Sequence, residues 1–356
     1  MSTGSDSPGG GTGGGAVSPA ASPAAAAGAQ PGTATAERPA GPAGAGAAAG
    51  GRLLRRGHRP ARLLSLPSRV AMWTGIALAL GAYTLFGLVP TVGNALISLT
   101  DYQDFPGETF NFIGLSNYTD MFTNERPGVT AAIKATIIFV LAVTIVQNAI
   151  AMMLAHRLSG PGRTTAILRV LVFLPAVLGV VVGGLIWILI FSPSGGPGAS
   201  LWSLFGAHSS FFGSSSLAMP LVIFVQIWLS LGFTSLVFIG GLKAIDPAIY
   251  EAAAIDGIGR WPRFRRITWP LMAPSVTANV LLAVVGAMTV FQTIYVLTDG
   301  QNGTMTLGML SFNTAFGTGS NLAFGAAVST SLFLVTLVVA VPLMWVLRWR
   351  ERRLLG

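Results

Sequence analysis

Six long apolar runs constrain the fold of this chain more than any other feature of its 356 residues. A helix needs about 20 apolar residues to cross the hydrocarbon core of a bilayer. In lipid the backbone polar groups must be satisfied within the protein, which favours helices. The sequence therefore predicts an all-α integral membrane protein with six transmembrane helices. The runs contain no Asp, Glu, Lys or Arg and cover roughly Val70–Leu99, Ala135–Ala155, Val170–Phe191, Leu217–Leu242, Val276–Leu297 and Ala323–Leu347.

The basic residues predict the orientation of these spans. The formal net charge is +9, which in a soluble protein would suggest a nucleic-acid partner. Here the basic residues flank apolar runs and gather in alternate connections, as expected for segments that stay in the cytoplasm. Arg126 and Lys134 alone lie in the opposite set of connections. We therefore expect no nucleic-acid partner and a multi-pass protein of the bacterial cytoplasmic membrane, with both termini in the cytoplasm.

The chain divides by composition into three parts. Residues 1–51 consist mainly of Gly, Ala, Pro, Ser and Thr, and such a segment cannot bury enough apolar surface to offset its ordering entropy. We expect a disordered cytoplasmic tail there. Residues 52–69 form a basic juxtamembrane segment, and residues 70–356 form the six-helix transmembrane domain.

Several function classes lack their required residues. The chain has no Cys, which excludes disulfides and thiolate metal sites, and the three His have no metal-ligand spacing. No phosphate-binding P-loop, nucleophile elbow or cluster of carboxylates occurs. We therefore expect no enzyme, no metal site and no cofactor bound by this chain. A secondary transporter usually needs an ionisable residue within its spans, and the runs have none. These residues do not exclude a channel.

The loop between the fourth and fifth runs, residues 243–275, contains the stretch EAAAIDGIGRWPRFRRITWPLMAPS from Glu251 to Ser275. Asp246 followed by Pro247 is a helix start signal. Gly257 stands where the left-handed residue that ends a helix would lie. Trp261-Pro262 opens a second short helix by the same reasoning. Small alanines in the first helix would let a partner approach closely.

The same stretch resembles the EAA motif of permease subunits of binding-protein-dependent ABC importers. The matching residues are Glu251, Ala252, Ala253, Gly257, Ile267 and Pro270, and Trp269 replaces the usual Leu. Other segments are similar to the carbohydrate branch of that family, in particular to the first permease of the maltose and glycerol-phosphate type. They are Gly114–Tyr118, Arg169 with Leu174-Pro175 and Trp187, and Ile294–Gly300, although Gln301-Asn302 departs from the usual pattern.

The resemblance implies a six-helix fold of the type I ABC importer permease kind. It implies that the loop 243–275 docks on a separate cytoplasmic ATPase dimer, which would bind ATP and Mg. The other implied partners are a second permease with an EAA motif, an extracellular solute-binding protein and membrane lipid. The implied function is import of a sugar or oligosaccharide; a permease for another solute, a secondary transporter and a channel stay as alternatives. The implied ATPase-coupling residues are Glu251, Ala252, Ala253, Asp256 and Gly257.

Polar and small residues in the fourth and fifth spans are candidates for the substrate path. Gln226, Ser230 and Phe233 share a helix face at spacings of four and three residues. In the fifth run, Asn279, Ala283, Gly286, Val290 and Thr293 are expected to share a face, with Thr289 at its edge. The resemblance implies ligand contacts from these two spans, and we expect Gln226, Ser230 and Phe233 to oppose Gly286, Thr289 and Thr293 across a cavity. Small and hydroxyl residues also occur where helices pack in lipid, so both interpretations stay open. Gln147-Asn148 is expected to make a polar interhelical contact.

Overall fold

The computed structural model describes residues 68–103, 109–123, 128–204, 209–318 and 320–355. Within these ranges the chain is helical, with one isolated β-bridge between Thr100 and Phe112 and no strand. The predicted disordered tail 1–51, and the juxtamembrane segment up to residue 67, lie outside the described residues. The predicted all-α fold class is confirmed.

In the described part of the chain, five helices are long and apolar enough to cross a membrane, and the number rises to six if the bent pair Arg260–Leu271 with Ala273–Met288 counts as one span. Several spans are assembled from consecutive pieces, joined in the first two by π-helical turns at Thr84–Leu88 and Val143–Gln147. The spans are α1 (Ser68–Tyr83) with α2 (Val89–Ile97), α4 (Val129–Ala142) with α5 (Asn148–Leu158), α6 (Arg163–Ile190), α8 (Ala218–Lys243), the bent pair that ends in α12 (Ala273–Met288), and α15 (Leu322–Leu355). Short helices connect them: α3 (Ser116–Phe122), α7 (Pro197–Ser203), α9 (Pro247–Ile255), α10 (Arg260–Arg263), α11 (Trp269–Leu271), α13 (Gln292–Thr298) and α14 (Leu307–Phe316).

The fifth span differs from its prediction. The sequence predicts one helix over Val276–Leu297, but α12 ends at Met288, and α13 begins at Gln292 after a break in helical geometry. The continuation of the predicted face to Thr293 is therefore wrong: Asn279, Ala283 and Gly286 lie on α12, whereas Thr293 lies on α13 beyond the break. A broken helix in lipid needs new partners for its free carbonyls. Thr306 supplies one, because its Oγ1 donates to the carbonyl oxygen of Val290 at 3.1 Å.

Gly308 allows the start of α14 to lie close to the break between α12 and α13. A Cβ atom at that position would lie 2.6 Å from the carbonyl oxygen of Val290, so a larger residue would push the two segments apart. The helix α14 begins here. Its first turn is capped by Thr306 Oγ1, which accepts from the amide of Met309 at 3.3 Å, and by Thr136 Oγ1 on α4, which accepts from the amide of Leu307 at 2.9 Å. Helix α14 then packs against α15 and α4.

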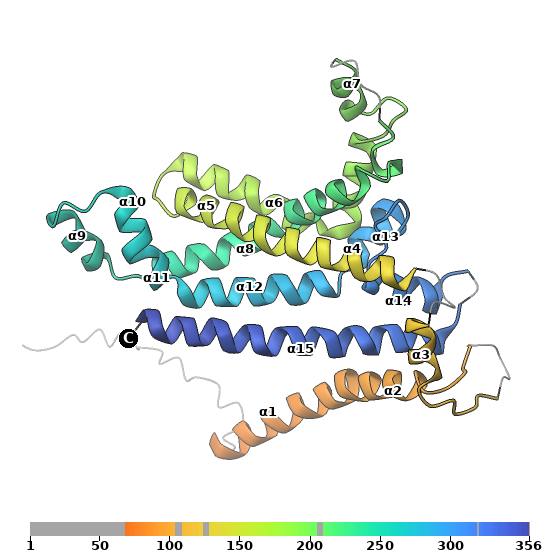
Figure 1. The fold of residues 1–356 in the computed structure, drawn as a ribbon. Helices are drawn as coiled ribbons and strands as arrows, with labels where there is room; N and C mark the ends of the chain where they lie inside the picture. The colour runs from red at the N-terminus through yellow and green to blue at the C-terminus, as the bar shows by residue number, and fades with distance from the viewer. Residues whose placement is uncertain (1–67, 104–108, 124–127, 205–208, 319, 356) are drawn as a thin grey trace, which may run out of the picture. The chain divides into compact units, whose positions relative to one another are not determined.

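The first span is held mainly at its second half. The apolar window of α1 and α2 is not buried within the chain, and in Figure 1 α1 diverges from α15 while α2 lies nearer to it. Asn94 on α2 makes the connection. Its Nδ2 donates to Ser329 Oγ at 2.8 Å and to Thr330 Oγ1 at 3.1 Å, both on α15.

The segment Gly114–Tyr118 locks the end of the first span to α3. Asn117 is buried, and its Nδ2 donates to the carbonyl oxygens of Ser98 and Thr100 at 2.9 Å each. The hydroxyls of Ser98 and Tyr118 lie 2.6 Å apart. These contacts satisfy carbonyls that the end of a helix leaves free.

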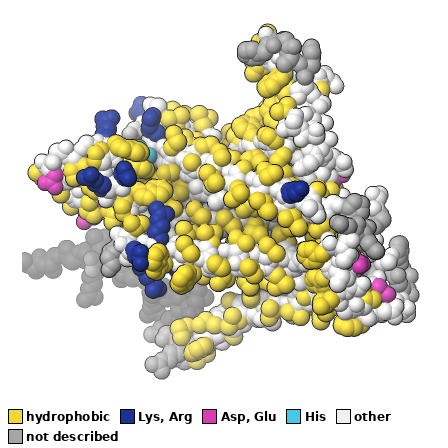
Figure 2. All heavy atoms as spheres, in the orientation of Figure 1, with side chains coloured by type: hydrophobic (Ala, Val, Ile, Leu, Met, Phe, Trp, Pro, Cys, Tyr) yellow, Lys and Arg dark blue, Asp and Glu magenta, His cyan; other side chains and the backbone are white. Residues whose placement is uncertain are grey.

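The two ends of the helical bundle differ in charge. In Figure 2, Lys and Arg side chains gather around α9, α10 and the C-terminal end of α15, and hydrophobic side chains cover the middle. Figure 1 places α3 at the opposite end from α9. Together with the preference of basic residues for the cytoplasmic side, this generates a prediction of topology.

We predict that α9 lies in the cytoplasm and α3 outside the cell. Because the chain has no Cys, single replacements Ser116→Cys and Asp256→Cys, both at exposed positions, report on one side each. In intact spheroplasts, a membrane-impermeant maleimide should label the Ser116→Cys variant, and it should label the Asp256→Cys variant only after permeabilisation. Labelling of the Asp256→Cys variant alone in intact cells would reverse the topology.

Candidate functional site

The helix α9 is a rigid unit that is capped at both ends. Asp246 Oδ1 accepts from the amide of Ala248 at 2.9 Å, as the Asp-Pro start predicts. At the other end, the amide of Ile258 donates to the carbonyl of Ala253 at 3.0 Å, and the amide of Gly257 donates to that of Ala254 at 3.1 Å. This pair of bonds is the Schellman motif. Gly257 has φ +69°, so its predicted left-handed conformation is confirmed.

The second helix of the loop 243–275 is also confirmed, and it begins at Arg260, one residue before the predicted start. Helix α10 continues through a π-helical turn at Phe264–Thr268 into α11. At Met272 the chain bends, and the axis of α12 departs from that of Arg260–Leu271 by 68°. Pro270 and Pro274 flank this bend, where their missing amides exclude ordinary helical hydrogen bonds.

Four of the five predicted coupling residues lie on the surface. Glu251, Ala252, Asp256 and Gly257 are exposed, whereas Ala253 is buried. Figure 1 shows α9 at one end of the helical bundle. Ile255, which the sequence analysis did not single out, has 86% of its surface exposed at the end of α9. The neighbouring small residues Ala252 and Ala254 are exposed as well.

An apolar base connects the loop 243–275 to the spans. Buried residues of α5 and α8 pack with Ile245 and Met272, and Tyr250 and Trp269 lie against this cluster. The hydroxyls of Tyr250 and Thr268 lie 3.2 Å apart, which links α9 to the second helix of the loop. Packed side chains therefore connect α9 to α5, α8 and the first turn of α12.

Half of the predicted substrate-path residues belong to a polar network inside the bundle. Thr293 Oγ1 donates to Gln226 Oε1 at 2.6 Å, and Ser230 Oγ donates to Gln147 Oε1 at 2.8 Å. Gln147 Nε2 then donates to Thr234 Oγ1 at 2.7 Å. The predicted interhelical contact of Gln147 is thus confirmed, whereas the amide group of its neighbour Asn148 donates within its own helix.

The other three candidates do not join this network. Phe233 has 57% of its surface exposed, and Gly286 and Thr289 are exposed on α12 and at its end. The hydroxyl of Thr289 donates to the carbonyl of Val285 on its own helix at 3.1 Å. The structure therefore brings Gln226, Ser230 and Thr293 together and leaves Phe233, Gly286 and Thr289 on open surfaces of this chain.

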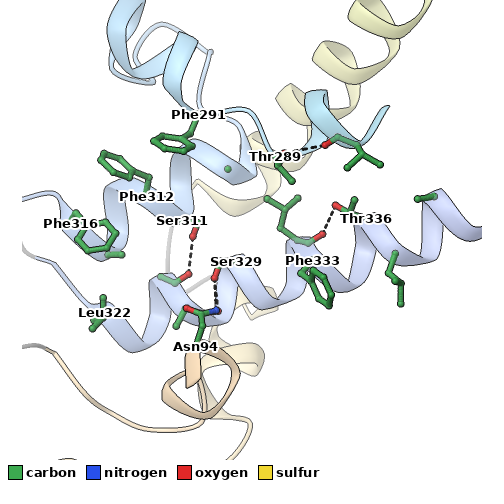
Figure 3. A pocket seen from close by; sticks show the side chains of 18 residues that line it. Asn94, Thr289, Phe291, Ser311, Phe312, Phe316, Leu322, Ser329, Phe333 and Thr336 are labelled. Carbon is green, nitrogen blue, oxygen red and sulfur yellow. Dashed lines mark hydrogen bonds between the residues drawn. The ribbon is translucent and has the colours of Figure 1, made fainter. Parts of the chain in front are cut away.

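Thr289 lines a groove of about 780 Å³ beside the break in the fifth span. We call it the aromatic groove, because Phe291 and Phe312 stack in its wall with ring centroids 4.9 Å apart. Figure 3 shows these rings with Phe316 on one side and Ser329 and Phe333 of α15 on the other. Asn94 reaches the groove from α2. The walls are mostly apolar, with a few hydroxyl groups.

Sequence reasoning missed the residues that hold the breaks and crossings together. Thr234 is buried at the centre of the polar network, since its backbone carbonyl also accepts from Asn279 Nδ2 at 3.1 Å. Thr306 and Thr136 cap α14. A Thr directly before an apolar run is a recognised helix start, so Thr306 could have been found. Thr136 carries no such signal, because its partner lies 171 residues away in the chain.

The comparisons with known proteins agree with this architecture. The diacetylchitobiose uptake system permease protein NgcF of Streptomyces coelicolor is 29% identical over 301 residues, covering 80% of this chain and 84% of the relative. The multiple sugar-binding transport system permease protein MsmF of Streptococcus mutans is 28% identical, covering 76% and 92%. A chain from the crystal structure of a bacterial ABC transporter involved in the import of alginate, an acidic polysaccharide, has a TM-score of 0.67 at 20% identity, covering 80% and 96%.

The family is shown by a match over residues 147–356, more than half of the chain, to the binding-protein-dependent transport system inner membrane component. The match includes the loop 243–275 and confirms the resemblance drawn from the EAA motif. It also covers α6, α8, α12 and α15, which include three of the helices that can cross a membrane. The chain therefore belongs to the family of binding-protein-dependent transport system inner membrane components, as a multi-pass transport protein and not an enzyme.

Proposed function

We propose that the chain is the permease subunit of an ABC importer that moves a neutral sugar or oligosaccharide into the cytoplasm. The relatives above are named as permeases for diacetylchitobiose and for multiple sugars, which supports a carbohydrate. The proposed partners are a second EAA-type permease, a cytoplasmic ATPase dimer that binds ATP and Mg, and an extracellular solute-binding protein. The proposed location is the bacterial cytoplasmic membrane, with both termini inside.

The observation that carries this proposal is the geometry of the loop 243–275. Helix α9 is capped at both ends and rests on an apolar base shared with α5, α8 and α12. In our proposal the exposed Glu251, Ala252 and Ile255 meet the ATPase, and Gly257 sets the direction of the chain that leaves α9. Closure of the ATPase dimer on ATP moves α9, and the packed base passes the movement to the spans. An ion pair made by Glu251 would contribute orientation more than affinity.

For the substrate path we propose two sets of residues: an exposed set that forms a wall, and a polar set that offers hydrogen bonds. Phe233 and Gly286, both exposed in this chain, form one wall of a passage that the second permease completes. A sugar offers an apolar ring face for Phe233 and needs room beside Gly286, where a Cβ atom would meet nothing within 4 Å. Gln226, Ser230, Thr289 and Thr293 offer uncharged donors and acceptors. The absence of charged residues from the six predicted runs favours a neutral substrate.

We predict that Gly257→Val uncouples the ATPase without preventing membrane insertion. A residue with a Cβ atom at positive φ costs about 1–2 kcal/mol, and Val is poorly tolerated there. If the loop relaxes to relieve that strain, the ATPase should be retained about tenfold less in pull-downs from solubilised membranes, since about 1.4 kcal/mol is tenfold.

The matched control is Gly259→Val, two residues away. Gly259 has φ −61° and ψ 165°, a conformation that Val adopts readily, so this variant should retain the ATPase like the wild type. Equal retention by both variants would remove the docking role from Gly257.

We predict that Gly286→Leu blocks uptake while the assembled complex still hydrolyses ATP. Because the space beside Gly286 is open within this chain, the variant should fold, and its side chain should occupy the proposed passage. The control is Gly81→Leu on α1, which also faces open space and should transport normally. Radiolabelled uptake and ATPase rates in proteoliposomes give the two readouts. Normal uptake by Gly286→Leu would return Gly286 to ordinary helix packing.

We predict that Gln226→Ala reduces uptake with little loss of stability. Interhelical hydrogen bonds in membranes average about 0.6 kcal/mol, and the Gln226 side chain makes one such bond, to Thr293. Thermal unfolding in detergent should therefore shift by only a few degrees. Unchanged uptake together with a large thermal shift would indicate a purely structural role.

A further inference from the structure

A cavity of about 940 Å³ lies between the loop 243–275 and the ends of α5 and α8. We call it the basic cavity, because Arg157 and Lys243 from the spans line it together with Arg260 and Arg263 from the loop. Glu251 is its single carboxylate. The sequence pattern relates these basic residues only to the predicted cytoplasmic side of the membrane.

In the part of the chain that the structure describes, no ion pair neutralises the basic residues of the basic cavity. Among the described residues, no Lys or Arg nitrogen lies within 4.0 Å of an Asp or Glu oxygen. Like charges gathered around one space repel one another. An anion in the cavity would remove this repulsion, and guanidinium groups bind phosphate oxygens in a bidentate manner.

An apolar groove of about 380 Å³ adjoins the basic cavity and shares four lining residues with it, among them Arg157 and Phe264. The rest of its lining is Met152, Met153 and Trp261. Met153 and Trp261 each have 69% of their surface exposed. Trp261 stacks on Phe264 with centroids 5.9 Å apart. An exposed Trp beside basic residues at the end of a span is typical of the membrane interface.

We infer that the basic cavity and its apolar groove together bind one anionic phospholipid. The phosphate lies among Arg157, Lys243, Arg260 and Arg263, and an acyl chain lies along Met153 and Trp261. A free phosphate would occupy only the basic cavity, and an acidic peptide would leave the apolar groove empty. A phospholipid would fill both, with its head group in the cavity and an acyl chain in the groove. Basic pockets between spans are known to bind lipid head groups in this way. This inference goes beyond the proposed transport function, because it does not depend on the solute or on the ATPase.

A lipid bound in this position would also restrain the loop 243–275. Arg260 and Arg263 belong to α10, whereas Arg157 and Lys243 lie at the ends of α5 and α8. A phosphate that contacts both pairs holds the loop against the spans. We expect the loop to be protected from proteolysis when the lipid is bound.

The test uses the complex purified through a tag on the full-length chain, delipidated and placed in phosphatidylcholine nanodiscs. Phosphatidylglycerol is titrated in, and the bound lipid is counted by native mass spectrometry. The double variant Arg157→Gln with Arg263→Gln should bind phosphatidylglycerol about thirtyfold more weakly, at about fivefold for each charge lost near the head group. Met153→Gln, at the exposed groove, should weaken binding by a smaller factor without changing the cavity.

The matched control is Arg348→Gln with Arg352→Gln, which removes two exposed charges from α15 outside the cavity. It should bind like the wild type; equal losses in both double variants would mean general surface attraction and overturn the site. Glycerol phosphate at millimolar concentration should compete poorly, and competition as strong as that of the lipid would mean a soluble anion. Loss of the ATPase from Arg157→Gln with Arg263→Gln at unchanged lipid binding would make the cavity a protein contact and also overturn the inference.

Discussion

Every backbone amide and carbonyl of this chain that leaves a helix inside the membrane must find a partner in the protein, and this requirement decides where the spans can break. The break after α12 exists because the hydroxyl of Thr306 reaches the free carbonyl of Val290. Gly308 leaves the space in which that approach is made. The amides that start α14 are then satisfied by Thr306 and Thr136. A few hydroxyl groups thereby allow the aromatic groove to form at a place where an unbroken helix would have filled the space.

A different constraint acts at the other end of the bundle, where water can satisfy free backbone groups. There, Asp246 and the Schellman motif around Gly257 close both ends of α9. In water such caps decide whether so short a helix forms at all, because isolated short helices are unstable. The helix can then remain exposed and rigid at once, which a surface for another protein requires. Its apolar base joins this surface to three spans without any ion pair within the described residues.

The sequence allowed the fold class, the spans and the caps of α9 to be predicted, because hydropathy and the Asp-Pro and Gly signals act over a few neighbouring residues. It did not reveal the break at Thr289–Phe291, since Val276–Leu297 contains no Pro and no charged residue, and the groups that stabilise the break lie beyond it, at Thr306 and Gly308. The sequence predicted the arrangement of the candidate substrate-path residues only in part. Helical spacing correctly relates Gln226 to Ser230, but it assumed a continuous helix from Gly286 to Thr293. The network centred on Thr234 depends on three helices meeting, which no local pattern records.

The bend at Met272 has a mechanical consequence. The segment Arg260–Leu271 and α12 meet at 68°, so this segment forms a short lever arm at the end of the longer helix α12. A force on the short arm perpendicular to the plane of the bend would exert a torque about the axis of α12, whereas a straight helix has no such lever arm. Rotation carries the exposed Gly286 and the buried Asn279 around the axis in the same sense. A small movement at the loop would thereby change the surface that α12 presents to its neighbours.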